Sequence, residues 1–380
     1  MKSVLIVKLT SLGDIIHSFL AVKEFKRQFP DCRIDWLVED VYHDLPLWLD
    51  EVDRVYCLNR KKLKHFDKVG LSKLYRIRQR NELKRNGYDA IIDLYFSREV
   101  NRYLHGVAPI VGLDAIDLGL IKKEPLQKRY YRQLLSPQDV IANLCHEKLE
   151  YVWFYRVLMA QFGDYSLSRE LDTTLYQVSS KRVPIVKTSY EDYLVFIHST
   201  SGDSKRWPVE YWRKLVEKAK EAGLKVLLPW GNDEEKQRAD KIALGFNNCQ
   251  VLPRYPISTL FALLRDSKGL IGGDTGFTHM ASFFDIPVVR IWGATFVGAA
   301  VPGPSAVDII SDYPCSPCMN LKSCKVIEQG LYADSPPCYD EITPETVWKS
   351  FRKIAAGGAA EKSEVYGGRL QAPHPQNLKQ

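Results

Sequence analysis

The segment that decides the fold is Val4-Leu5-Ile6-Val7-Lys8-Leu9-Thr10-Ser11-Leu12-Gly13-Asp14-Ile15-Ile16-His17, near the start of the chain. Its apolar run Val4–Val7 has the length and composition of a buried strand, and a turn containing glycine follows it. The next stretch, Ile15–Gln28, is typical of a helix that ends before Pro30. A short buried strand followed by a turn and a helix is the repeating unit of a parallel α/β sheet.

The same alternation recurs along the chain, with a polar, irregular interruption around Ser179–Lys187. Further strands are expected at Ile34–Val38, Arg54–Tyr56, Ala90–Leu94, Tyr193–Ile197, Val226–Leu228, Gln250–Leu252, Gly269–Gly272 and Val288–Ile291. Two such series predict an α/β protein with two doubly wound, Rossmann-like domains that face a cleft. In doubly wound sheets, ligands bind outside the carboxyl ends of the strands, so we expect the functional residues there.

Composition limits the class of protein. The 380 residues include 45% apolar and 26% charged residues, as expected for a globular protein with two ordinary domains. The net charge of +7 fits an ordinary basic surface, or a preference for phosphates, nucleotides, acidic lipid headgroups or nucleic acid. No apolar run approaches the ~20 residues that span a bilayer, and no signal-peptide cleavage site is evident. We therefore expect a cytoplasmic protein whose eight cysteines are mostly reduced.

Asp14 lies where the polar turn of the opening segment meets the first predicted helix. An aspartate at this place commonly caps the helix. Alternatively, it places a carboxylate at the mouth of a cleft, where it could take a proton from a hydroxyl group. The turn contains neither a G-x-G-x-x-G nor a Walker pattern, which disfavours a dehydrogenase or a P-loop enzyme.

Two later strands also run into polar turns that suit a diphosphate. The segment His198–Pro208 combines hydroxyl groups with the cations Lys205 and Arg206, although it could equally be a polar surface loop. The segment Gly272–Ala281 has glycines that let backbone amides approach an anion, and His279 follows one turn later. Both turns are expected at the carboxyl edge of the second sheet.

The basic run Arg60–His65 is a further candidate site in the first half of the chain. It could be a solvated surface, or it could bind a phosphorylated or acidic acceptor. It lacks the interleaved aromatic residues that are typical of nucleic-acid surfaces, so we do not expect nucleic acid as a partner.

Four cysteines cluster in a proline-containing segment near the C-terminus: Cys315, Cys318, Cys324 and Cys338. They could hold a structural zinc or iron ion as a tetrathiolate site. The spacing is not the paired C-x-x-C pattern of a zinc ribbon, so a disulfide or plain reduced thiols remain open.

Several of these segments, in this order, resemble the heptosyltransferases of glycosyltransferase family 9. The matching segments are Ser11–His17, Ile34–Glu39, Gly87–Asp93, His198–Trp207, Leu228–Gly231 and Asp274–His279. The resemblance runs from Val4 to about Ala355. It implies a GT-B architecture with an acceptor-binding domain over residues 1–180, a nucleotide-sugar-binding domain over 181–343 and a closing helix over 344–356. The Gly- and Pro-containing tail over 357–380 is expected to be disordered.

The resemblance also implies a reaction. L-glycero-D-manno-heptose would move from ADP-heptose, with inversion and without a required metal, to a Kdo residue of the lipopolysaccharide inner core. An acceptor of the Kdo–lipid A type implies peripheral contact with the inner membrane. Lysines stand at acceptor-side positions where the family often has arginines, which weakens bidentate phosphate recognition. Another glycan or a protein acceptor, with metal at the cysteines, is therefore an alternative, as is a binding protein without activity.

The resemblance assigns roles residue by residue. Asp14 would be the general base, and Lys205 would stabilise the leaving ADP. The donor would contact Thr200, Ser201, Glu235, Asp274, Thr275, Gly276 and His279. The acceptor would contact Ser11, Lys61, Lys62, Lys64, Lys123 and His146. This set supplies the base and the diphosphate-neutralising cation that glycosyl transfer needs.

Overall fold

The computed structural model describes residues 1–59, 72–95, 103–113, 131–135, 151–168, 172–179, 181–182, 189–200, 202–301, 303–320, 323–328, 335–357 and 364–366. The chain divides into two compact units, Met1–Val183 and Pro184–Gln380. Each unit contains one sheet of parallel strands with helices between them. The predicted α/β class with two parallel sheets is thereby confirmed.

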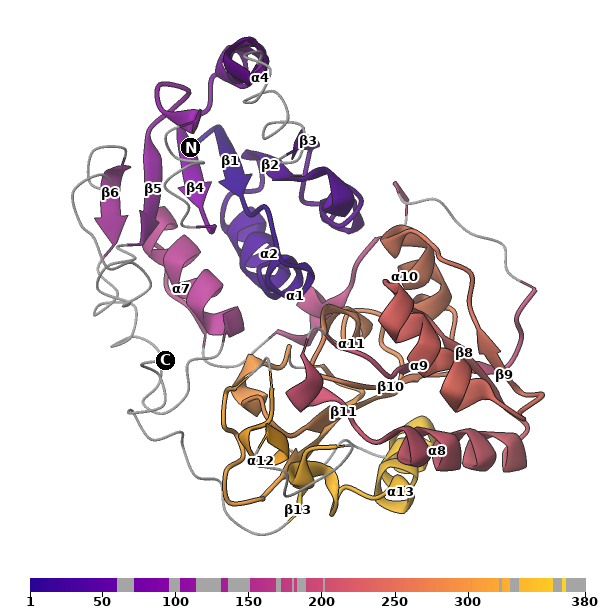
Figure 1. Cartoon of the computed structure of the whole chain (residues 1–380). Coiled ribbons are helices and arrows are strands. Elements are labelled where there is room, and N and C mark those ends of the chain that lie inside the picture. The colour runs from indigo at the N-terminus through magenta and orange to yellow at the C-terminus, as the bar shows by residue number, and fades with distance from the viewer. Residues whose placement is uncertain are drawn as a thin grey trace. The chain divides into compact units, whose positions relative to one another are not determined.

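Among the described residues, the sheet of the first unit has six strands in the order β3-β2-β1-β4-β5-β6 (Figure 1). These strands are β1 (Ser3–Val7), β2 (Arg33–Glu39), β3 (Arg54–Leu58), β4 (Ala90–Asp93), β5 (Ile110–Leu113) and β6 (Tyr131–Leu135). The helices are α1 (Leu12–His17), α2 (Phe19–Gln28), α4 (Ser72–Arg85) and α7 (Tyr151–Gly163), with single turns η1 (Asp40–Tyr42), η2 (Pro46–Trp48) and η3 (Thr173–Tyr176). The strand order reverses at β1, which is where doubly wound sheets bind ligands.

The apolar composition of β1 explains its central position. All five of its residues are buried, and Val4 is level with Ile34 of β2 on one side and with Ala90 of β4 on the other. Helices α2 and α7 lie side by side on this sheet (Figure 1). Arg156 of α7 is buried and donates to Glu24 of α2, with Nε 2.7 Å from Oε2. This ion pair holds α2, the helix that follows α1 in the chain, against α7.

In the second unit the described strands form a seven-stranded sheet, in the order β13-β12-β11-β10-β7-β8-β9. They are β7 (Tyr193–Ile197), β8 (Lys225–Leu228), β9 (Cys249–Val251), β10 (Leu270–Gly273), β11 (Val288–Trp292), β12 (Ala306–Ser311) and β13 (Glu364–Tyr366). The helices are α8 (Val209–Glu221), α9 (Asp233–Ala243), α10 (Ile257–Arg265), α11 (Gly276–Ala281), α12 (Lys325–Glu328) and α13 (Pro344–Ala355). Single turns occur at η4 (Asp203–Lys205), η5 (Val297–Ala299) and η6 (Pro337–Tyr339).

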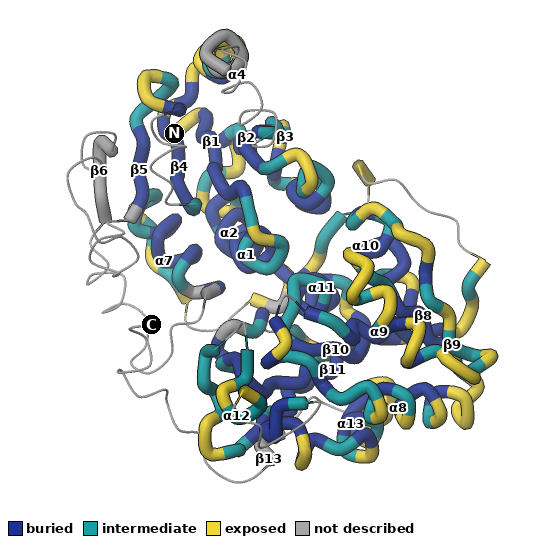
Figure 2. Tube along the Cα trace, in the orientation of Figure 1, coloured by how far each residue is buried: buried dark blue, intermediate teal, exposed yellow. Residues whose placement is uncertain are grey.

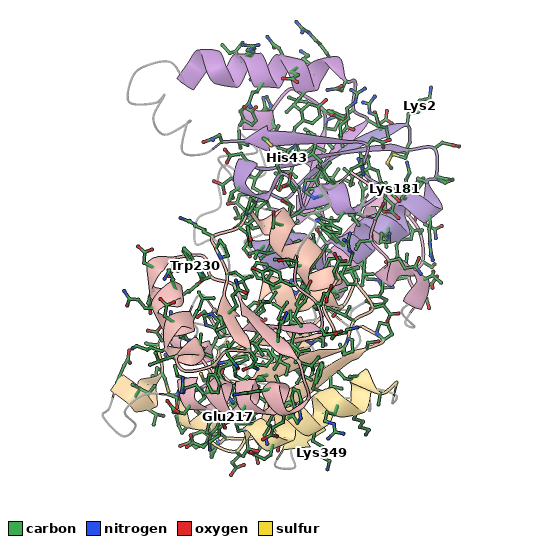
Figure 3. All side chains as sticks on the ribbon, turned by 90° about the vertical axis from the view of Figure 1, so that its right-hand side faces the viewer. Lys2, His43, Lys181, Glu217, Trp230 and Lys349 are labelled. Atoms are coloured by element: carbon green, nitrogen blue, oxygen red, sulfur yellow. The ribbon has the colours of Figure 1, made fainter. Side chains whose placement is uncertain are left out.

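Helices α8 and α13 lie side by side and cover the core of the second unit. The buried residues of this core are dark blue in Figure 2. Trp212 of α8 and Phe351 of α13 are buried in this core. Glu217 and Lys349 lie on the exposed faces of the same two helices, where Figure 3 labels them. The helix predicted over 344–356 is thus amphipathic, and its apolar face packs on the second unit.

The tail predicted to be disordered, 357–380, contains one described strand. Glu364–Tyr366 form β13, which pairs in parallel with β12 at the edge of the sheet. Valine and tyrosine favour extended backbone, which is consistent with a short edge strand here. Most of the remaining tail lies outside the described residues.

Candidate active site

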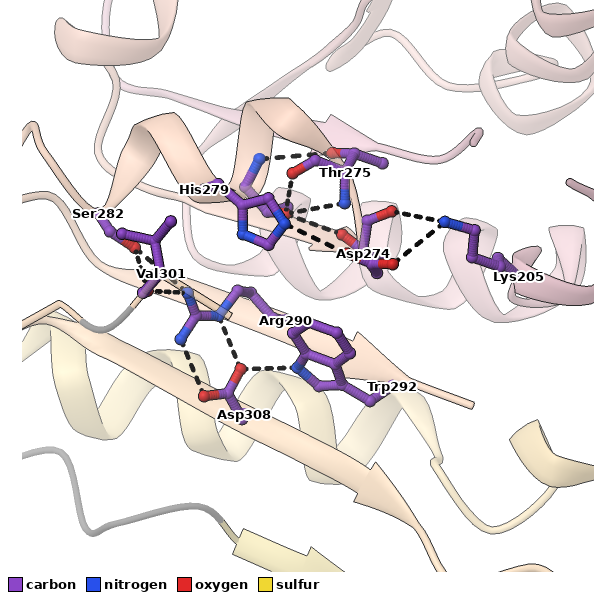
Figure 4. Close-up of polar contacts among 11 residues, drawn as sticks. Lys205, Asp274, Thr275, His279, Ser282, Arg290, Trp292, Val301 and Asp308 are labelled. Atoms are coloured by element: carbon purple, nitrogen blue, oxygen red, sulfur yellow. Dashed lines mark hydrogen bonds and ion pairs between the residues drawn. The ribbon is translucent and has the colours of Figure 1, made fainter. Parts of the chain in front are cut away.

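The carboxyl ends of the neighbouring strands β7 and β10 bring Lys205 and Asp274 together. Lys205 ends the turn η4 that follows β7, and Asp274 directly follows β10. The Lys205 Nζ atom lies 3.1 Å from Asp274 Oδ2 and 3.4 Å from the Asp274 carbonyl oxygen. The two side chains are 10% and 14% exposed, so they form a largely buried ion pair at the edge of the sheet (Figure 4).

Helix α11 adds a histidine to the same carboxylate. Thr275 caps this helix, because its Oγ1 accepts from the Thr278 amide at 3.4 Å while Thr278 Oγ1 accepts from the Thr275 amide at 3.2 Å. His279, one turn further on, places Nε2 3.2 Å from Asp274 Oδ1. A Cβ at Gly272 would lie 2.8 Å from Cγ2 of Thr278, so glycine at this position allows the helix to pack closely on β10.

The environment keeps the Asp274 carboxyl ionised. Burial alone raises its pKa, but the hydrogen bond from His279 and the charges of His279 and Lys205 outweigh burial and hold the pKa well below its usual range. An ionised carboxylate only accepts hydrogen bonds, so His279 Nε2 is the donor in this contact. Asp274 is therefore suited to orient Lys205 and His279, and unsuited to serve as a base.

Other predicted donor residues lie along the same edge. Thr200 follows β7, and its Cγ2 would be 3.6 Å from a Cβ on Gly273. Glu235 lies in the first turn of the helix after β8, where its Oε2 accepts from the Gly231 amide at 2.7 Å. Gly276 is the first residue of α11. Because β8, β7 and β10 are consecutive in the sheet, the structure brings these predicted residues to one edge; Ser201 lies outside the described residues.

His198, which directly follows β7, is neutral. Burial and the charge of Arg238 lower its pKa to about 3. Its Nε2 lies 3.1 Å from the Pro229 carbonyl oxygen, so Nε2 carries the proton and Nδ1 can accept from Ser199 Oγ at 2.9 Å. This histidine anchors the turn to the end of β8 and is not placed to act as a proton acceptor for a substrate.

A buried charged network lies beside the donor-site residues (Figure 4). Arg290 of β11 donates to both carboxylate oxygens of Asp308 on β12, at 2.7 and 2.8 Å. Trp292 Nε1 donates to the same carboxylate at 2.6 Å, and the Trp292 ring lies 6.4 Å from the His279 ring, centroid to centroid. Arg290 also donates to Ser282, which caps the end of α11. The network therefore fixes the helix that carries His279.

The candidate site of the first unit lies at the end of β1, where Asp14 is in the first turn of α1. Asp14 is not the N-cap residue, since Ser11 holds that position; instead, Asp14 Oδ2 accepts from the Ser11 amide at 3.4 Å. The same oxygen lies 3.4 Å from Lys8 Nζ, and the Asp14 side chain is 36% exposed. The carboxylate is thus held in place and still reachable. The other predicted acceptor residues, Lys61, Lys62, Lys64, Lys123 and His146, lie outside the described residues.

Comparison with known proteins identifies the family. The profile described as glycosyltransferase family 9 (heptosyltransferase) matches residues 126–326. Lipopolysaccharide heptosyltransferase 1 of Pseudomonas aeruginosa is 33% identical over 365 residues, which cover 90% of this chain and 95% of that protein. The chain belongs to glycosyltransferase family 9.

Further comparisons agree with this membership. Lipopolysaccharide heptosyltransferase 1 of Escherichia coli K12 is 29% identical over 332 residues, covering 86% of this chain and 98% of that protein. The solved structure of E. coli heptosyltransferase WaaC with ADP-2-deoxy-2-fluoro heptose has the same fold, with a TM-score of 0.68 and 24% identity. That match covers 92% of this chain and 99% of the WaaC chain. Within the described part of the family 9 chain, no helix is long and apolar enough to cross a membrane.

The structure does not show the metal site that the cysteine segment allows. Among the residues it describes, which include Cys315, Cys318, Cys324 and Cys338, no three His, Cys, Asp or Glu side chains form a group that could hold a metal ion. All four cysteines are free. Burial, together with the nearby thiols of the other three, raises the pKa of Cys338 well above its ordinary value.

Sequence reasoning missed Lys8, Arg290 and Asp308. One signal was available for the last two, because each interrupts an otherwise apolar strand, Val288–Trp292 or Ala306–Ser311. A charge within a buried strand requires a buried partner. The sequence could have suggested that these strands carry paired charges, but not that the pair supports α11.

Proposed function

We propose that this chain transfers L-glycero-D-manno-heptose from ADP-heptose to a Kdo residue of the lipopolysaccharide inner core, with inversion at the anomeric carbon. The names of the lipopolysaccharide heptosyltransferase 1 relatives support heptose transfer to lipopolysaccharide, and the WaaC structure with an ADP-fluoroheptose supports an ADP-linked donor. The observation that carries the proposal is the buried Lys205–Asp274–His279 group at the edge of the second sheet.

In the proposed reaction, the second unit binds the donor. Lys205 neutralises the charge that develops on the diphosphate as the bond between the anomeric carbon and the phosphate oxygen breaks. Asp274 holds the ammonium in place, so little reorganisation is required during the reaction. The donor site is completed by Thr200, Ser201, Glu235, Thr275, Gly276 and His279.

The first unit binds the acceptor in this proposal. The Kdo hydroxyl oxygen attacks the anomeric carbon, Asp14 takes the hydroxyl proton, and ADP leaves with the bonding electron pair. The anionic acceptor contacts Ser11 and the basic residues Lys61, Lys62, Lys64, Lys123 and His146. Because that acceptor is a lipid, we propose a cytoplasmic protein that contacts the inner membrane peripherally. No metal takes part in the proposed steps.

The proposal is tested by incubating the purified chain with ADP-heptose and Kdo₂–lipid A and analysing the lipid by mass spectrometry. We expect one heptose to be added by the wild-type protein and by an Asp31→Asn control, which changes an exposed carboxylate of the same unit. An Asp14→Asn variant should lose at least about 10²-fold in rate, because it lacks the general base. Full activity of that variant would contradict the role of Asp14, and an unmodified lipid in the wild-type reaction would contradict the acceptor.

A further inference from the structure

Lys8 is a buried cation at the carboxyl end of β1. Its side chain is 6% exposed, and its Nζ lies 3.4 Å from Asp14 Oδ2. Its backbone is fixed on both sides, because its amide donates to the Leu37 carbonyl at 3.2 Å and its own carbonyl accepts from Trp36 Nε1 at 3.2 Å. Lysine is seldom this deeply buried unless it has a specific partner. For Lys8, the ion-pair partner is the carboxylate proposed as the base.

Two aromatic rings also lie close to the ammonium of Lys8. Nζ lies 5.2 Å from the ring centroid of Tyr155 on α7 and 5.9 Å from that of Tyr95, just after β4. Both distances are within the range of a cation–π interaction. The helix α7 is itself tied to α2 by the ion pair between Arg156 and Glu24. The position of Nζ is therefore set by three separate elements of the first unit.

The charges near this pair determine how it responds to pH. Burial lowers the pKa of Lys8, and the nearby carboxylates of Asp14 and Asp93 oppose this effect without cancelling it. The titratable groups around the pair are Asp93 at the end of β4, Tyr95, Tyr155 of α7, and Tyr42 with Glu39 beyond Asp14. None of these groups is a cation at neutral pH, whereas Lys8 Nζ lies within ion-pair distance of Asp14.

We infer that Lys8 is a positioning residue for Asp14, which holds the carboxylate in place and keeps it ionised when the acceptor covers it. The inference rests on the proposed function, in which Asp14 is the general base. A bound acceptor removes water from Asp14 and, being anionic, adds negative charge; both effects favour the protonated acid, which cannot accept a proton. The ammonium of Lys8 opposes both effects, and it is too buried to contact the acceptor itself.

The test compares Lys8→Met, which removes the charge, with Lys8→Arg, which keeps it, by measuring kcat against pH. For Lys8→Met, the acidic limb of the kcat profile should move up by roughly one pH unit, a modest value because Asp14 is partly exposed. Below this limb the variant should be about tenfold slower than the wild type, and the rates should converge at higher pH. Lys8→Arg should retain the wild-type limb.

A purely structural role predicts a different result. It would lower kcat by the same factor at every pH, and that outcome would overturn the inference. If Lys8→Met does not fold, Lys8→Gln keeps a hydrogen-bond donor without the charge and should show the same displaced limb. Failure of the proposed function is recognised separately, because the wild type would then show no heptose transfer at any pH.

Discussion

Replacement of Lys205 by methionine should reduce turnover far more than it reduces substrate binding. The ammonium is 10% exposed and fixed 3.1 Å from Asp274, so it is a preorganised charge in a site with little water. Removal of one such stabilising group from a transition state typically costs about 10² to 10³ in kcat, which is about 3–4 kcal/mol. Lys205→Arg keeps the charge with a different shape and should recover part of the loss.

The same substitution has a second, smaller consequence. Asp274 would lose the ammonium of Lys205 but would keep its hydrogen bond with His279, so the free energy of unfolding should fall by about 1–3 kcal/mol. Initial rates of ADP release and urea unfolding measure the two effects, and Lys225→Met, at an exposed position of the same unit, is the matched control. A folded Lys205→Met protein with kcat within about threefold of the wild type would refute the reasoning, since that loss is far below the expected range.

Three further predictions concern the support of the donor site. Asp308→Asn should lower the free energy of unfolding by about 3 kcal/mol or more, because Arg290 stays buried without its counterion, and urea unfolding measures this loss. Since the pKa of His198 is lowered to about 3 in the folded chain, protonation favours the unfolded state. Stability should therefore fall with pH from about 6.5 towards 3, and His198→Gln should lack that part of the dependence. Gly272→Ala should destabilise the chain by about 1–3 kcal/mol and weaken ADP binding in calorimetry, because its Cβ would press on Thr278.

Each of these predictions has an outcome that would contradict it. Unchanged stability of Asp308→Asn would mean that the buried pair is dispensable. An identical pH dependence in wild type and His198→Gln would mean that this histidine does not titrate on unfolding. ADP affinity and stability unaffected in Gly272→Ala would mean that α11 can move away from β10 at no cost.

Much of the fold could be predicted because the central strands are continuous apolar runs. The strands expected at Val4–Val7 and Tyr193–Ile197 appear as β1 and β7 within one residue at either end. Strands β6 and β12 could not be predicted in this way. Tyr131–Leu135 contains arginine and glutamine, and Ala306–Ser311 is interrupted by Asp308. Such strands are determined by their neighbours in the sheet, which local sequence does not specify.

The candidate site was predictable where residues follow strands, and less so where their roles depend on packing. Position alone placed Lys205 and Asp274 at one edge, and the structure shows that they form an ion pair. The neutral state of His198 depends on burial and on Arg238, forty residues away in the chain. The contact between Lys8 and Asp14 depends on the turn that joins β1 to α1. Distances of this kind follow from tertiary structure and not from spacing in the sequence.

The most direct test of the central claim is a coupled assay of ADP release by the purified chain with ADP-heptose, in the presence and absence of Kdo₂–lipid A. The proposed function predicts ADP release that depends on the acceptor and that Lys205→Met largely abolishes. Release at the same rate without the acceptor, or no release in its presence, would contradict the claim that this chain transfers heptose to the lipopolysaccharide core.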